Sequence, residues 1–89
     1  MNADKFGAFI AACRKERHMT QLELAQKLQV TDKAVSRWER GKGFPDISML
    51  IPLSEALEIT VTELMRSEKM EKREDHFSRE EVESMMADM

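Results

Sequence analysis

Apolar residues near the start of the chain recur with the spacing of one helix face. They stand three or four positions apart: Phe6, Phe9, Ile10 and Cys13. This is the period of an amphipathic helix, whose apolar side faces a core. The pattern therefore predicts a first helix over residues 4–17.

A second, shorter helix is predicted directly after it. Thr20-Gln21-Leu22-Glu23 has the pattern of a capping box, in which the threonine hydroxyl accepts a backbone hydrogen bond and Glu23 bonds back. Leu24, Ala25 and Leu28 then fall on one side. We expect a helix over residues 21–28, followed by a turn at Gln29-Val30.

Thr31 can cap a third helix in the same way. Its buried side would carry Ala34, Val35 and Trp38, and it would end near Arg40. Glycine and proline residues then break the pattern: Gly41, Gly43 and Pro45. Two short helices joined by a few residues, directly after a longer helix, are the layout of a helix-turn-helix.

The apolar pattern resumes after Asp46 and continues to about residue 66. Its members are Ile47, Leu50, Ile51, Ala56 and Leu57. Pro52 lies inside this run, so we expect a kink or a tighter first turn. Thr60-Val61-Thr62-Glu63 is a further capping box and predicts a last short helix through Leu64 and Met65. The prediction is an all-α, compact five-helix bundle over residues 4–66.

The remaining residues change in character. Residues 66–76 are nearly all charged, and a short apolar stripe follows after Ser78: Val82, Met85, Met86 and Met89. An isolated helix of this length is marginal in water, so the stripe either docks on something or frays. We expect 1–66 to be one domain, and 67–89 to be a charged linker with a short amphipathic helix. That helix is a dimerisation element, a docking site for a partner protein, or the start of a missing region of a longer protein.

Size and composition fit one small domain. The chain has 89 residues, of which 42% are hydrophobic, and a single cysteine, which cannot form an internal disulfide. A reduced, cytoplasmic setting is therefore expected. We assign Cys13 to the core, because neither His18 nor His76 stands at metal-ligand spacing from it. No signal peptide and no membrane contact are expected.

The net charge of −3 does not describe the body of the chain. Residues 1–66 hold ten Lys and Arg against nine Asp and Glu, whereas residues 67–89 hold four against eight. One short stretch of the body is rich in cations: Lys27, Lys33, Arg37, Arg40 and Lys42. Because the local field is what meets phosphates, the acidic total does not argue against a nucleic-acid partner.

The segment Thr20–Arg40, TQLELAQKLQVTDKAVSRWER, followed by GKGFPD, resembles the Cro/repressor-type (XRE-like) helix-turn-helix family of bacterial and phage transcriptional regulators. The likeness extends from Phe6-Gly7 to Leu64. Ala25 matches the small residue that lets the second motif helix cross closely, and Val35 and Trp38 match its buried apolar positions. Two departures are Gln29 and Glu58, which stand where the family usually has glycine.

This resemblance implies a phage-repressor-like fold and sequence-specific binding to double-stranded DNA. The recognition helix, at about Thr31–Arg40, would lie in the major groove, and the protein would act as a homodimer on a near-palindromic operator. The implied base contacts are Lys33, Arg37, Ser36, Asp32 and Thr31. The implied phosphate contacts are Gln21, Arg40, Lys42 and the amides around Gly41 and Gly43. Arg14 and Glu39 match an internal ion pair.

A protein-interaction module is the alternative from another class. In that case the stripe Val82–Met89 would be the functional part, because methionines form an adaptable apolar surface. An enzyme is not expected, since the sequence shows no carboxylate pair, activated nucleophile, metal set or phosphate loop. No cofactor and no metal are therefore predicted.

Overall fold

A computed structural model describes residues 2–70. Within that range every regular element is helical: α1 (Ala3–Glu16), α2 (Gln21–Leu28), α3 (Asp32–Glu39), the 3₁₀ turn η1 (Ile47–Met49), α4 (Leu50–Leu57) and α5 (Val61–Arg66). The predicted all-α, five-helix fold is confirmed, and the helix ends lie within about two residues of those expected. The stripe Val82–Met89 lies outside the described residues.

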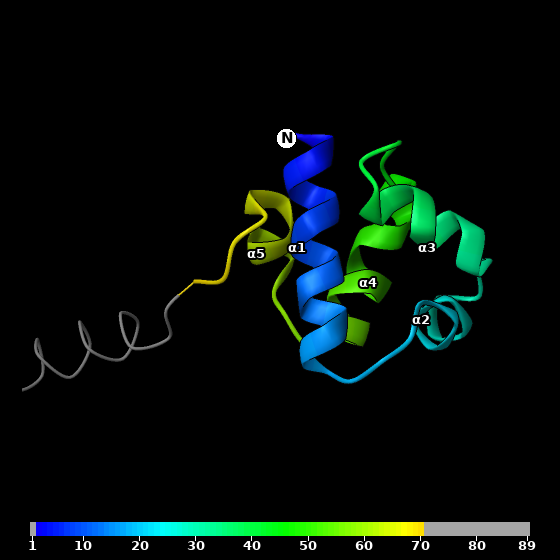
Figure 1. Ribbon diagram of the computed structural model, residues 1–89. Helices are drawn as coiled ribbons and strands as arrows, with labels where there is room; N and C mark the ends of the chain where they lie inside the picture. The colour runs from blue at the N-terminus through cyan, green and yellow to red at the C-terminus, as the bar shows by residue number, and fades with distance from the viewer. Residues whose placement is uncertain (1, 71–89) are drawn as a thin grey trace, which may run out of the picture.

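Helix α1 occupies the centre of the bundle (Figure 1). It packs against α3, α4 and α5, while α2 packs against α3 and α4. Buried apolar residues from all five helices form one core: Phe6, Ile10, Cys13, Leu24, Ala25, Leu28, Val35, Trp38, Leu53, Leu57 and Leu64. Because α3 is held between α1 and α2, one of its sides is committed to this core.

Threonine residues begin three of the helices, as the sequence indicates. The Thr20 hydroxyl accepts from the Glu23 amide at 3.0 Å, and the Thr20 amide donates to the Glu23 carboxylate at 2.8 Å. Thr60 and Glu63 form the same reciprocal pair at 2.9 and 3.0 Å. These bonds satisfy first-turn amides that have no partner inside the helix, so they fix where α2 and α5 begin.

Pro52 falls in the first turn of the fourth helix. It is the third residue of α4, where its missing N–H would have no partner inside the helix in any case. The tighter turn lies just before it, as the 3₁₀ turn Ile47–Met49. The apolar run of this region is not all core, however: Ile47 is 79% exposed and Ile51 is 61% exposed.

The two positions that depart from the family's glycines are left-handed. Gln29 has φ 60° and ψ 41°, and Glu58 has φ 58° and ψ 45°. Each ends a helix, α2 and α4, and a residue with a Cβ is strained in this conformation. Both sites therefore keep the left-handed backbone conformation that glycine adopts most easily, although neither residue is glycine.

We predict that Gln29→Gly stabilises the domain by about 1 kcal/mol, because it removes the left-handed strain. Urea unfolding followed by circular dichroism measures the difference. Gln26→Gly is the matched control: Gln26 is exposed inside α2, where glycine costs about 1 kcal/mol. Equal destabilisation by both changes would contradict the prediction.

Glu63 is titratable, and its carboxylate holds the backbone at both ends of α5 through hydrogen bonds. Its carboxylate accepts from the Thr60 amide and, at 2.8 Å, from the Met70 amide. These backbone hydrogen bonds hold the pKa of Glu63 below its usual value of 4.5. Because the lowered pKa belongs to the folded state, the stabilisation is fully present above pH 4.5 and is lost as the pH falls through the folded-state pKa.

Glu63→Gln should remove this pH dependence, because glutamine keeps an acceptor oxygen but does not titrate. The wild type should be the more stable protein at about pH 6, and its advantage should shrink towards about pH 3. Urea titrations at several pH values test this. Asp46, whose pKa is lowered by its hydrogen bonds with Ser48, is present in both proteins and so cancels. A constant difference between the two proteins would count against this role of Glu63.

Candidate nucleic-acid interface

Helix α3 has one buried and one exposed side. Val35 is 0% exposed and Trp38 is 7% exposed, both packed into the core. On the opposite side Asp32, Lys33 and Arg37 are exposed, and Ser36 is half-buried. Since residues three and four apart on a helix are neighbours, these four side chains form a single polar surface, which we call the outer face of α3.

Local hydrogen bonds determine where α3 begins and how its ends are arranged. The Thr31 hydroxyl accepts from the Ala34 amide at 3.1 Å, which caps the helix. At the other end, Arg40 Nε donates to Ser36 Oγ at 3.2 Å. Thr31 and Ser36 therefore already have partners in α3 and its caps, whereas Lys33 makes no side-chain hydrogen bond to any of residues 2–70.

Arg37 lies beside the loop that follows α3. Its Nη2 is 3.5 Å from the Lys42 carbonyl oxygen, a long and weak hydrogen bond. A Cβ added to Gly43 would also lie 3.5 Å from the same Nη2. The guanidinium is thus exposed and loosely held, and it can be redirected at little cost.

Two glycines let the end of α3 approach α1 closely. A Cβ added to Gly7, inside α1, would collide with the carbonyl oxygens of Trp38 and Glu39. Gly41 has φ +74°, and a Cβ there would collide with the Asp4 carboxylate. The role of Gly7 was not predicted, although a lone glycine within a helical pattern is a signal for close packing.

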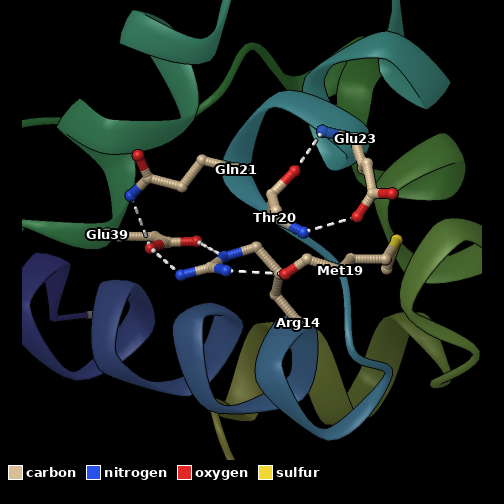
Figure 2. A network of polar contacts seen from close by, with 6 residues as sticks. All are labelled: Arg14, Met19, Thr20, Gln21, Glu23 and Glu39. Atoms are coloured by element: carbon tan, nitrogen blue, oxygen red, sulfur yellow. Dashed lines mark hydrogen bonds and ion pairs between the residues drawn. The ribbon is translucent and has the colours of Figure 1, made fainter.

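A buried ion pair joins α1 to α3. Arg14 Nε lies 2.7 Å from Glu39 Oε2, with the two side chains only 11% and 7% exposed. Arg14 also donates from Nη2 to Glu39 Oε1 at 3.1 Å and from Nη1 to the Met19 carbonyl at 2.7 Å (Figure 2). The carboxylate of Glu39 therefore points inward and does not face a ligand on the outer face of α3.

Gln21 connects α2 to the same carboxylate. Its Nε2 donates to Glu39 Oε1 at 2.9 Å, as Figure 2 shows. Three helices thus meet at one acceptor: the last turn of α1, the first residue of α2 and the last residue of α3. Since α2 and α3 form the helix-turn-helix, this network fixes the two helices relative to each other.

The charges around α3 are unbalanced. Four cations lie on or directly after the helix: Lys33, Arg37, Arg40 and Lys42, all of them exposed. With Glu39 paired internally, Asp32 is the only carboxylate among residues 32–43 that faces solvent. A surface with this excess of positive charge attracts a polyanion.

The Cys13 thiol and the metal-ligating side chains do not form a second candidate site within residues 2–70. Cys13 is 2% exposed, and burial raises the pKa of its thiol, which agrees with a core role. Residues 2–70 contain no group of three His, Cys, Asp or Glu side chains that could hold a metal ion. In the same range, no helix is long and apolar enough to cross a membrane.

Comparison with known proteins identifies the family to which this chain belongs. The model of the family described as Helix-turn-helix matches residues 10–64, more than half of the chain. The chain belongs to the helix-turn-helix family. The resemblance predicted from Thr20–Arg40 is therefore confirmed.

Two relatives of the helix-turn-helix family are named for their regulatory roles. The transcriptional activator BcrR of Enterococcus faecalis is 33% identical over 66 residues, which cover 74% of this chain and 32% of that protein. The repressor protein C2 of Salmonella phage P22 is 31% identical, covering 91% of this chain and 38% of that protein. The chain thus spans about a third of the length of these relatives.

One similar solved structure is a complex with an operator. The P22 c2 repressor in complex with a synthetic operator has a TM-score of 0.64 and is 34% identical, covering 66% of this chain and 89% of that one. Together the family model and these relatives show that residues 10–64 form a helix-turn-helix domain similar to those of transcriptional regulators.

We predict that Glu39→Ala destabilises this helix-turn-helix domain by about 3 kcal/mol, because it leaves the Arg14 guanidinium buried without its partner. Glu58→Ala is the matched control. Glu58 pairs with Arg17 at 2.8 Å, but its side chain is 67% exposed, so its loss should cost less than about 1 kcal/mol. Thermal and urea unfolding measure both. A Glu39→Ala effect as small as that of Glu58→Ala would rule out a structural role for the pair.

Proposed function

We propose that this protein regulates transcription by inserting α3 into the major groove of double-stranded DNA and reading its sequence there. The observation that carries the proposal is the outer face of α3, on which Lys33, Ser36 and Arg37 stand opposite the buried Val35 and Trp38. The major groove admits one helix, and each base pair presents a distinct pattern of donors and acceptors in it.

The outer face supplies the base contacts in this proposal. Arg37 fits a bidentate contact to guanine O6 and N7, the commonest specific contact, and its weak bond to the Lys42 carbonyl is easily exchanged. Lys33 reads a guanine or holds a phosphate. Ser36 is half-buried and reaches a base only close to the helix surface. Asp32 accepts from a cytosine amino group, while Thr31 mainly caps the helix.

Phosphate contacts would fix the register of the protein on the duplex. We assign them to Arg40, Lys42 and the backbone amides near Gly41, which follow α3 directly. Gln21 contributes through its backbone, because its side-chain amide nitrogen is bound to Glu39 and first-turn amides have no partner within a helix. Such contacts orient the protein but carry no sequence information.

Assembly and location belong to the same proposal. Two copies would bind a near-palindromic site with their recognition helices about 34 Å apart, one turn of DNA. Residues 1–66 would be the DNA-binding domain, and residues 67–89 a linker with a further element, in the cytoplasm. The contacts of Lys69 with Glu16 and of the Met70 amide with Glu63 extend the packed region slightly beyond residue 66.

Arg37→Ala should relax specificity at one base step and cost roughly 1–3 kcal/mol there. Lys42→Ala, the matched control, should weaken binding about equally on all sequences and reduce the dependence of affinity on salt. Fluorescence anisotropy on a panel of singly substituted duplexes, at two salt concentrations, separates the two patterns. A uniform loss for Arg37→Ala would identify it as a phosphate contact instead.

A further inference from the structure

Exposed apolar side chains are concentrated where η1 passes into α4. Within residues 2–70 six large hydrophobic side chains are exposed, and three of them lie within residues 44–51: Phe44, Ile47 and Ile51. The two isoleucines, which we call the isoleucine pair, are 79% and 61% exposed. The other side of α4 is buried through Leu53 and Leu57. A helix that is apolar on both sides is expected to be covered on both.

Two carboxylates without a cation flank the isoleucine pair. Asp46 directly precedes Ile47, and Glu55 follows Ile51 by four residues, which places it on the same side of α4. Both carboxylates are exposed, and neither forms an ion pair with any other of residues 2–70. The whole segment 44–65 contains no lysine or arginine. The apolar surface is therefore bordered by unbalanced negative charge.

This charge disfavours several occupants of the surface. DNA and an anionic membrane would both be repelled by it. Residues 67–89 of the chain carry four Lys and Arg against eight Asp and Glu, so they would be repelled as well. A second copy of the same surface would bring two carboxylates against their own equivalents, and like charges across an interface cost free energy. The occupant that fits has apolar side chains bordered by lysine or arginine.

The backbone around the isoleucine pair is fixed by its own packing. Pro45 is buried, and the ring of Phe44 packs edge-on against Phe6 with centroids 5.3 Å apart. The Asp46 carboxylate accepts from the Ser48 amide at 3.1 Å and so caps η1. Because the surface is ordered before a partner arrives, binding requires little further loss of conformational freedom.

We propose that the isoleucine pair is a docking surface for a basic amphipathic helix of a partner protein. The apolar stripe of that helix covers Ile47 and Ile51, while its lysine or arginine side chains pair with Asp46 and Glu55. Side chains four apart, such as Ile51 and Glu55, form the ridges through which two helices pack. The contact is independent of base reading by α3, so its test contains no DNA.

The small size of the surface makes this contact weak and transient. A stable interface buries about 800 Å² on each partner, far more than two isoleucine side chains provide. A short peptide can therefore reproduce most of the contact, and a full partner protein is not needed for the test.

The probe is a synthetic, labelled peptide of about 18 leucine and lysine residues, with the leucines at helical spacing. Fluorescence anisotropy follows its titration with the full 89-residue chain. The wild type should bind it, and Ile47→Ser with Ile51→Ser should weaken binding about tenfold, because two large apolar side chains are no longer removed from water. Glu55→Lys should weaken binding most at low salt, since exposed charges are screened as salt rises.

Matched controls separate this surface from general charge attraction. Met65→Ser removes an apolar side chain of α5 that is 49% exposed, and Glu68→Lys changes the net charge by the same amount as Glu55→Lys. Both variants should bind the peptide as the wild type does. A peptide of the same composition with its leucines out of helical spacing should bind much more weakly, and so should one with glutamate in place of lysine.

Shifts of backbone amide signals in the wild type provide a measurement that needs no variant. On addition of the leucine–lysine peptide, the changes should centre on residues 46–55. Circular dichroism verifies that the serine variant is folded, as expected for two exposed positions.

The inference is overturned if the serine variant binds the peptide as tightly as the wild type, if Met65→Ser causes an equal loss, or if the signal changes centre elsewhere. A wild type that dimerises in sedimentation, while the serine variant stays monomeric, would make a second copy the occupant and overturn it as well. None of these results bears on DNA binding by α3.

Discussion

The carboxylate of Glu39 receives hydrogen bonds from Arg14 and Gln21, and the arrangement of α1, α2 and α3 depends on it. Its burial has a cost, which the bidentate geometry and the third donor offset. Because the acceptor sits on the last residue of α3, the network ties the end of that helix to α1 and to the start of α2. In the proposed function, the outer face of α3 would be presented to DNA only as accurately as this network holds.

Close backbone packing works together with the polar network. Gly7 lets α1 touch the carbonyl groups at the end of α3, and Gly41 lets the following loop pass the Asp4 carboxylate. Gly7 has no ligand contact in the proposed function, whereas the amides near Gly41 are among the proposed phosphate contacts. Helix α3 is thereby supported by α1 and α2, while Lys33, Arg37, Arg40 and Lys42 remain exposed. Rigid support beneath exposed cations is what accurate groove reading requires.

The helices could be predicted because their signals are local. Capping boxes at Thr20 and Thr60 and the apolar spacing of α1 depend on nearby residues only. The Arg14–Glu39 pair, 25 positions apart, came from family resemblance. The bond from Gln21 to Glu39, the collision that Gly7 avoids and the exposure of Ile47 and Ile51 were not predicted. Each depends on how elements meet in space, and an apolar residue in a helical period looks the same whether its side is covered by this chain or by another.

A selection from random duplex DNA with the 89-residue chain, followed by titration of the enriched duplex at two salt concentrations, would show whether α3 reads base sequence. We expect enrichment of a short inverted repeat whose half-site contains guanine, with affinity that falls steeply as salt rises. Salt-sensitive binding without any enriched sequence would contradict base reading by α3. No binding at low salt would contradict the assignment of this surface to DNA altogether.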